Sequence, residues 1–257
     1  MSVAKLALEF AVQSAAGART AQTVGADRVE LCTALGPTGG VAPSPGLVEQ
    51  VAGVGLPTFV MVRCRPGPFC YDNDELAVMT ADAAQAIRLG AAGVVFGALT
   101  PRGTADIQAF ARIRDAARSV DAAAQLICHR AFDVLISLDR DAPALEALVE
   151  LGCQRILTSG GAAKAGDGAG ALTRLVQQSA GRIEIQAGGH VRPHDVAALA
   201  ATGVDAVHTS ATGIIIIPGP GAGPGGGDSR VEVTDPSRAQ AMAEAVAQVR
   251  AARQSDR

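Results

Sequence analysis

Charged and polar side chains occur within or at the ends of several short apolar runs of this sequence, at positions suited to acid–base chemistry. Glu9 and Glu30 lie in two such runs, and Arg63, Arg65 and His129 lie in later ones. Carboxylates and histidines transfer protons, while arginine guanidinium groups bind anions, often through two parallel hydrogen bonds. Brought together in one pocket, these residue types predict proton transfer on a small anionic molecule.

The apolar runs alternate with alanine-rich amphipathic stretches, which indicates a repeating strand–helix unit. A glycine ends several helices just before the next strand, as at Gly25, Gly90, Gly152 and Gly203. Eight such units in 257 residues are typical of an α/β fold of the (β/α)₈ TIM barrel type. No dinucleotide-binding glycine fingerprint follows the first run, which argues against a doubly wound sheet. The expected strands are 6–13, 28–32, 57–65, 93–98, 125–130, 155–159, 183–187 and 205–210, and the expected helices are 14–24, 45–53, 74–89, 104–119, 141–151, 169–180 and 193–202.

We expect a single domain over residues 1–257, with one irregular segment. Residues 212–230 include a run of Gly and Pro that favours neither helix nor strand, so they predict a flexible loop before a last helix at 235–252. The apolar residues 214–217 precede this run. We expect them to be buried, in a strand extension or a subunit contact, because an exposed apolar run is an aggregation hazard.

Side-chain alternation along each strand predicts which residues point into the barrel. A barrel interior built for stability alone would hold layers of Val, Ile and Leu, because buried charges cost several kcal/mol unless they are paired. Here most strands place polar groups inward, either as a structural ion-pair network (Glu9, Glu30, Arg63 and Arg65) or as a functional site. The inward polar and thiol side chains include Glu9, Arg28, Glu30, Cys32, Arg63, Arg65, Gln125, His129, Glu184, Gln186, His208 and Ser210.

The functional interpretation is favoured because these residues cluster toward the carboxyl ends of strands, the face where barrel enzymes place their chemistry. Glu30, Glu9 and His129 are the candidates for proton transfer, and Arg63 and Arg65 are the candidates for binding an anionic group.

Asp133 lies four residues after His129 and is a further catalytic candidate. Its carboxylate would either fix the tautomer of the histidine or cap the helix that follows.

The loops after the last three strands predict an anion site. Ser159 follows the sixth strand, Gly188 and Gly189 follow the seventh, and His208 and Ser210 end the eighth. Barrels often cradle phosphate with loop amides and a helix N-terminus at these positions, so we expect a small anionic ligand there. His190 and His194 are expected to face solvent.

Composition excludes several other functions. A net charge of −3 and the absence of tryptophan argue against a nucleic-acid partner, and no apolar run approaches the roughly 20 residues of a membrane span. Neither Lys5 nor Lys164 stands at a strand end, which disfavours a Schiff-base aldolase. The five scattered cysteines predict neither a disulfide framework nor a structural zinc module, and they fit a reducing cytoplasm.

Cys32 is the one metal-ligand candidate, since it faces inward at a strand end. A lone cysteine is more often a small buried apolar residue, and a Cu(I) site would need a second thiolate or thioether beside it.

These motifs, in this order, resemble the CutC family over roughly residues 6–212. The resemblance implies a cytoplasmic TIM barrel, a homodimer, and a role in copper handling with copper as its ligand. The matching stretches are GADRVELC at 25–32, PSPGL at 43–47, MVRCRP at 61–66, FCY at 69–71, VFGAL at 95–99, HRAFD at 129–133, RILTSG at 155–160 and AGG at 187–189.

The chain departs from the family pattern in its first strand. Members of the family commonly carry an inward cysteine there, which together with the cysteine matching Cys32 forms the copper site proposed for the family, but this chain has Ala11. Gln13 stands where an acid is usual. Two functions therefore stay open: copper binding and homeostasis, or a lyase or isomerase that removes a proton next to a carbonyl in a small phosphorylated or sugar-like substrate.

Overall fold

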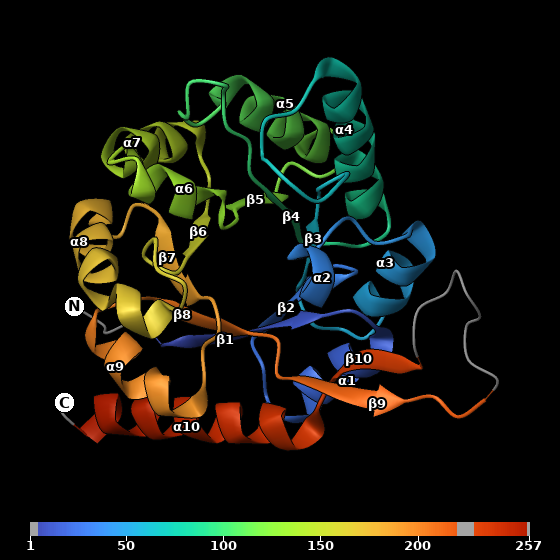
Figure 1. The fold of residues 1–257 in the computed structure, drawn as a ribbon, viewed down its shortest axis with the longest axis vertical. Coiled ribbons are helices and arrows are strands. Elements are labelled where there is room, and N and C mark those ends of the chain that lie inside the picture. The colour runs from blue at the N-terminus through green and yellow to red at the C-terminus, as the bar shows by residue number, and fades with distance from the viewer. Residues whose placement is uncertain (1–4, 220–228, 256–257) are drawn as a thin grey trace.

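The computed structural model describes residues 5–219 and 229–255, and its centre is a closed barrel of eight parallel strands surrounded by helices (Figure 1). The strands follow one another in chain order around the barrel, and β8 pairs with β1 to close it. The predicted (β/α)₈ barrel is confirmed. The strands are β1 (Ala7–Val12), β2 (Arg28–Leu31), β3 (Thr58–Met61), β4 (Gly93–Phe96), β5 (Gln125–Cys128), β6 (Arg155–Thr158), β7 (Glu184–Gly188) and β8 (Ala206–Thr209).

The helices that cover the barrel agree with the sequence prediction, apart from two short ones that it lacks. These are α2, in the loop after β2, and α6, which begins right after β5. The helices are α1 (Ala15–Thr23), α2 (Leu35–Thr38), α3 (Pro45–Ala52), α4 (Asn73–Arg88), α5 (Ile107–Arg118), α6 (Ala131–Ser137), α7 (Asp141–Leu151), α8 (Ala169–Ser179), α9 (Val196–Ala201) and α10 (Pro236–Ser255), with 3₁₀ turns at Ala165–Gly168 and Pro193–Asp195. Among the described helices, none is both long enough and apolar enough to cross a membrane.

The strands separate an outer apolar layer from a smaller inner one, as alternation predicts. Leu8, Phe10 and Val12 of β1 pack in the large core between strands and helices. The inner apolar cluster is small, so much of the barrel interior is left to polar side chains; its buried members are Cys32, Phe59, Met61, Val95 and Ile127.

The segment 212–230, expected to be a flexible loop, begins in one strand and ends at the start of another. β9 (Thr212–Ile216) and β10 (Arg230–Thr234) pair as an antiparallel hairpin beside the barrel (Figure 1), while residues 220–228 lie outside the described part of the chain. The prediction of a loop over 212–230 is therefore wrong at both of its ends. Strands on each side of the Gly–Pro run are rich in β-branched residues, which favours this pairing.

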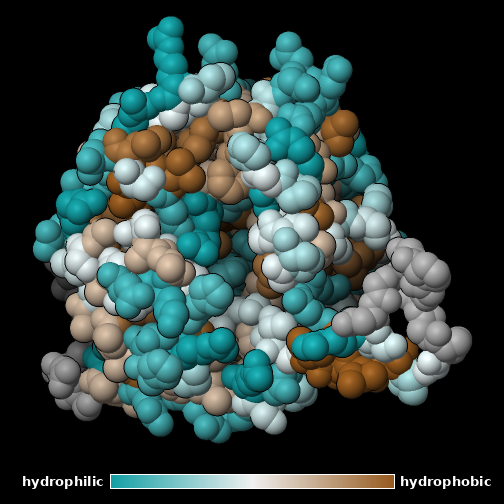
Figure 2. All heavy atoms as spheres, in the orientation of Figure 1, coloured by the Kyte–Doolittle hydropathy of each residue, from teal (hydrophilic) through white to brown (hydrophobic). Residues whose placement is uncertain are grey.

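The isoleucines at 214–217 are exposed in the single chain, so the chain itself does not bury them, while their burial in a subunit contact stays a prediction. Ile216 keeps 73% of its surface accessible, and the other three keep about half. The hairpin stands at the side of the barrel, so β9 has only β10 as a strand partner among the described residues. Apolar atoms accordingly gather over β9 in Figure 2.

Candidate active site

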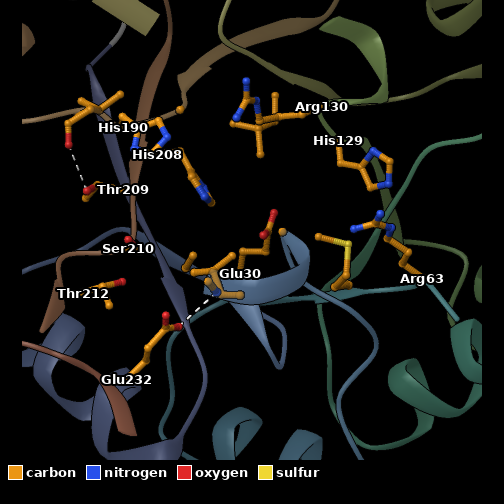
Figure 3. Close-up of a pocket in the computed structure, with 18 of the residues that line it drawn as sticks. Glu30, Arg63, His129, Arg130, His190, His208, Thr209, Ser210, Thr212 and Glu232 are labelled. Atoms are coloured by element: carbon orange, nitrogen blue, oxygen red, sulfur yellow. Dashed lines mark hydrogen bonds between the residues drawn. The ribbon is translucent and has the colours of Figure 1, made fainter. Parts of the chain in front are cut away.

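A cavity of about 460 Å³ opens at the carboxyl-terminal mouth of the barrel (Figure 3). Strand ends supply its floor, and the loops that follow them supply its walls. Its polar lining consists of Glu30, Arg63, His129, Arg130, His190, Arg192, His208, Thr209, Ser210, Thr212, Glu232 and Arg238, and its larger apolar lining residues are Leu35, Met61, Phe69, Leu157 and Val191.

Glu30 contributes a buried carboxyl group to the cavity. It points inward from β2, where its neighbours Val29 and Leu31 pack outward, and only 3% of it is exposed. Its Oε2 atom is buried and has no hydrogen-bond partner among the described residues. Burial raises the pKa of Glu30 to about 7, and the nearby charge of His208 opposes this rise. Near neutral pH the group can both accept and return a proton.

His129 contributes a buried hydrogen-bond donor to the cavity. The backbone N–H of Ala131, at the start of α6, donates to Nδ1 at 3.1 Å, so the ring proton is on Nε2. Nε2 is buried and has no partner in the described structure. Burial, together with the charge of Arg63, lowers the pKa of His129 to about 3. The ring is therefore a neutral donor, which suits it to polarise a carbonyl oxygen rather than to remove a proton.

Close packing holds the His129 ring in place. The Phe69 ring lies with its centroid 4.9 Å from that of His129. Gly97 provides space for the ring, because a Cβ atom there would be only 2.3 Å from Cε1 of His129.

Arg63 places a positive charge in the wall beside this donor. It donates to the carbonyl oxygens of Thr38 (2.9 Å), Gly40 (3.0 Å) and Gly67 (2.9 Å), and it stacks on Phe69. No carboxylate pairs with it within the described chain, and its buried Nε has no partner. Arg63 therefore fixes two loops and leaves its charge available to stabilise an anion in the cavity.

Glu9 lies beneath the cavity floor and does not line it, so its predicted catalytic placement is not supported. Each of its oxygens accepts two hydrogen bonds: from Arg28 (2.7 Å) and Arg155 (3.1 Å) on Oε2, and from Gln186 (2.7 Å) and His208 (2.9 Å) on Oε1. Burial alone would raise the pKa of Glu9, but these partners hold it well below its usual range. Glu9 is thus the centre of a buried ion network. The sequence alone allows such a structural network with Arg63 and Arg65, but the arginines that contact Glu9 are Arg28 and Arg155.

His208 links this network to the cavity. Since ionised Glu9 can only accept, Nδ1 of His208 is the donor in their 2.9 Å hydrogen bond. Burial would lower the pKa of His208, but the two neighbouring carboxylates, Glu30 and Glu9, raise it. One ligand atom from each of Glu9, Glu30 and His208 lies within 4.8 Å of the others. Glu30 therefore faces an imidazole whose orientation is fixed by Glu9.

Arg65 does not join Glu30, Arg63 and His129 in the cavity, which corrects its predicted placement. It pairs with Glu75 at the start of α4 and stacks on the Tyr71 ring at 5.1 Å. The strand β3 ends at Met61, and the alternation of side chains continues as far as Arg63 but does not extend to residue 65.

Asp133 neither fixes His129 nor caps a helix, contrary to both expectations. It accepts hydrogen bonds from Arg130 Nε (2.7 Å), from the Ser159 N–H (2.9 Å) and from the Gly161 N–H (3.1 Å). Its role is to hold the loop after β6 against α6.

The predicted anion-binding loops are only partly at the cavity. Gly189, His208 and Ser210 line it, whereas Ser159 and Gly188 do not. Ser159 lies behind Arg130 and donates to Asp133, and Gly188 is packed so tightly that a Cβ there would approach Leu157 to 2.4 Å. His190, expected to face only solvent, is exposed but also lines the cavity, while His194 is exposed.

Several lining residues were not named as site candidates in the sequence analysis. Arg130 could have been found, since it directly follows His129, and Met61 and Phe69 belong to the stretches quoted for the resemblance. Glu232 and Arg238 could not, because they come from β10 and α10, after the Gly–Pro run. Only the pairing of β10 with β9 brings them to the mouth.

Copper does not fit the residues present. Cys32 is fully buried and does not line the cavity, and burial followed by the charge of Glu30 raises the pKa of its thiol, so it stays protonated. The oxygen and nitrogen group of Glu9, Glu30 and His208 offers harder ligands, but both Glu9 oxygens are already occupied by four donors.

Comparisons with known proteins give one consistent result. The protein-family model described as "CutC family" matches residues 6–213 of this chain. A CutC family protein of Caulobacter vibrioides is 40% identical over 257 residues, covering 98% of this chain and all of that protein. One from Agrobacterium fabrum is 43% identical over 199 residues, covering 77% of this chain and 76% of that protein.

Solved structures agree with this result. The CutC structure from Streptococcus agalactiae, named as a candidate copper homeostasis protein, is 29% identical with a TM-score of 0.72 and covers 80% of this chain and 98% of its own. An aldolase structure named QR15 has a TM-score of 0.60 at 15% identity, covering 82% of this chain and 92% of that one, and so shares the fold alone.

Proposed function

The chain belongs to the CutC family, and from that premise we propose that its cavity carries out acid–base chemistry on a small anionic carbonyl compound, as a lyase or isomerase. One observation carries the proposal. Two buried polar groups, Oε2 of Glu30 and the His129 Nε2–H, face the same cavity without a hydrogen-bond partner among the described residues. Unpaired buried polar groups are costly, so their retention points to a ligand that pairs with them.

His129 supplies the electrophile in this reaction. Its Nε2–H donates to the carbonyl oxygen of the substrate, and Arg63 adds positive charge on the same side. As the neighbouring carbon loses its proton, negative charge develops on that oxygen, where a fixed donor stabilises it without reorganisation. The donor in this hydrogen bond is the N–H of a neutral imidazole. The pKa for loss of that proton lies closer to the pKa of an enediol than the pKa of an imidazolium does, so the neutral ring is well matched to this task.

Glu30 supplies the base. A carboxylate with a pKa of about 7 removes the proton on the adjacent carbon and stays protonated long enough to return it. Return to the neighbouring carbon gives an isomerase, and loss of a leaving group from the β-carbon gives a lyase. His208, oriented by Glu9 and with its pKa raised by the Glu30 and Glu9 carboxylates, lies beside Glu30 before the transfer.

Arg130 and the loop after β7 suit the anionic group of the substrate. Two nitrogens of Arg130 are held by Asp133 and Ser159, while 41% of its side chain stays exposed. A Cβ on Gly189 would approach Nη1 of Arg130 to 3.3 Å, so the glycine lets this guanidinium lie against the loop. Arg192 lines the same wall.

Proton exchange in D₂O tests this proposal. NMR would follow loss of the α-proton signal in a panel of phosphorylated and carboxylated α-hydroxy ketones. We expect exchange of at least one compound by the unaltered protein, loss of that exchange in Glu30→Gln, and no change in the exposed control Glu49→Gln. Absence of exchange across the panel, or equal exchange in Glu30→Gln, contradicts the proposal.

Copper homeostasis is the second candidate, and it rests on the name of the streptococcal relative and on one contact. The position of a Cβ on Gly40 lies 3.4 Å from Sγ of Cys32 and 3.6 Å from Cε of Met61, so a thiol and a thioether side chain lie on the same side of that glycine. This pair of soft ligands is the arrangement that supports the copper candidate. Competition with a Cu(I) chelator tests this candidate: tight binding of one equivalent that Cys32→Ser removes would favour it.

The cytoplasmic location and the homodimer implied by the resemblance stay predictions. Fractionation and light scattering on the full chain test them.

A further inference from the structure

The hairpin β9–β10 brings one carboxylate, Glu232, into the wall of the cavity from outside residues 6–213, the part matched by the family model. One of its oxygens, Oε2, is fixed. It accepts from the side chain of Gln13 at 3.0 Å and from the backbone N–H of Gly36 at 3.1 Å. Gln13 is itself oriented by the Leu35 N–H, which donates to its Oε1 at 2.9 Å.

The other oxygen of Glu232 is open. Oε1 makes no hydrogen bond within residues 5–219 and 229–255, and it occupies the space beside Gly36, where a Cβ would lie 1.8 Å from it. The hydroxyl groups of Ser210 and Thr212 line the same side of the cavity, and they too make no hydrogen bond in the described chain. Figure 3 shows these three side chains on one side, with Arg63 and His129 on the other.

This distribution of charge separates two ends of the cavity. Arg63 and Arg130 lie toward His129, where the anionic and reacting groups are expected, whereas Glu232 lies with the two hydroxyls. A carboxylate repels the anionic end of a ligand and accepts hydrogen bonds from hydroxyl groups. If Glu232 were the only charged group in this wall, it would also suit an ammonium group. Arg238 disfavours a second cation there, because it lines the same wall and donates to the Thr212 carbonyl.

We infer that the substrate is a hydroxylated anion of the sugar-phosphate or sugar-acid class, and that Glu232 is the residue that selects its hydroxyl end. This inference rests on the proposed function and deepens it. The chemistry at Glu30 and His129 comes from the barrel, while selection of the substrate comes from the hairpin that follows it. Glu232 is a specificity-determining residue and takes no part in proton transfer.

Binding of three probes by isothermal titration calorimetry tests the inference. Inorganic phosphate carries the anion alone, glycerol 3-phosphate adds two hydroxyls, and phosphoethanolamine adds an ammonium group. We expect glycerol 3-phosphate to bind at least about tenfold more tightly than phosphate, since each charge-assisted hydrogen bond to a hydroxyl contributes on the order of this factor. Glu232→Gln should remove most of that preference and leave phosphate binding unchanged, and Glu49→Gln should alter neither.

Ser210→Ala provides a second variant, because it removes one hydroxyl without disturbing the contacts of Glu232. It should lower the affinity for glycerol 3-phosphate severalfold and spare phosphate. Equal binding of phosphate and glycerol 3-phosphate, or tightest binding of phosphoethanolamine, overturns the inference but not the proposed function. Failure of all three probes to bind the unaltered protein overturns the anion site and the inference with it.

Discussion

Substituting Gly97 by alanine should displace His129 without changing any polar group of the cavity. The added Cβ would lie 2.3 Å from Cε1 and 2.4 Å from Nδ1 of the His129 ring, and 2.8 Å from Cβ of Ala131. Restoring ordinary contact requires the ring to move by about 1 Å, a displacement that can lower the rate of a positioned reaction about a hundredfold. The same overpacking should cost about 1–3 kcal/mol of the free energy of unfolding.

Two readouts check this prediction. Proton exchange in D₂O should fall about a hundredfold, and the ¹⁵N and ¹H resonances of His129 should shift, because the Ala131 N–H no longer meets Nδ1. Gly46→Ala is the matched control, since a Cβ there has no atom within 4 Å. Unchanged His129 resonances together with full exchange activity in Gly97→Ala would refute the assignment of His129 as a rigidly held donor.

Three further predictions concern buried groups. Glu9→Gln should destabilise the fold by about 3 kcal/mol or more in urea unfolding, because it leaves the buried charge of Arg155 largely uncompensated; a loss no larger than that of the exposed Glu146→Gln would contradict the network. Glu30→Gln should gain stability relative to the unaltered protein, by up to about 3 kcal/mol above pH 7, because a pKa raised from 4.5 to about 7 means that the folded state disfavours the ionised carboxyl. That gain should vanish as the pH falls below about 4.5, and a pH-independent difference would rule out the raised pKa. Cys32→Ser should leave Cu(I) affinity unchanged in chelator competition, whereas strong loss would restore the copper candidate.

The barrel was predictable because its signals are local and repeated. Each strand needs only an apolar run, and each connection needs only an amphipathic stretch with a terminal glycine. Strict alternation also placed Glu30, Arg63 and His129 correctly inside, because the neighbours of Glu30 and Arg63 pack against the outer helices.

Prediction from the sequence extended only to the first residues after each strand. Arg63 still follows the alternation of β3, whereas Arg65, farther along the loop, has its direction set by Glu75 and Tyr71. Parity alone also could not distinguish Glu9 from Glu30. The first is surrounded by Arg28, Arg155, Gln186 and His208, and the second has no hydrogen-bond partner for its buried oxygen, a difference that depends on depth in the barrel.

Contacts between distant segments were outside the reach of sequence patterns. Glu232 meets Gln13 across 219 positions of the chain, through a hairpin interrupted by a Gly–Pro run that reads as a loop. The buried arginine of β6, Arg155, was overlooked for a related reason: its charge is compensated by Glu9 of β1, a strand that does not neighbour β6 in the barrel.

The central claim is that Glu30 is the base, and the pH dependence of kcat/KM for proton exchange tests it most directly. This quantity reports the ionisation of the free protein. We expect it to rise about tenfold per pH unit in the acidic range and to level off near pH 7, where burial places the pKa of Glu30. A profile that is already level at pH 5, or one that is unchanged in Glu30→Gln, would contradict the assignment.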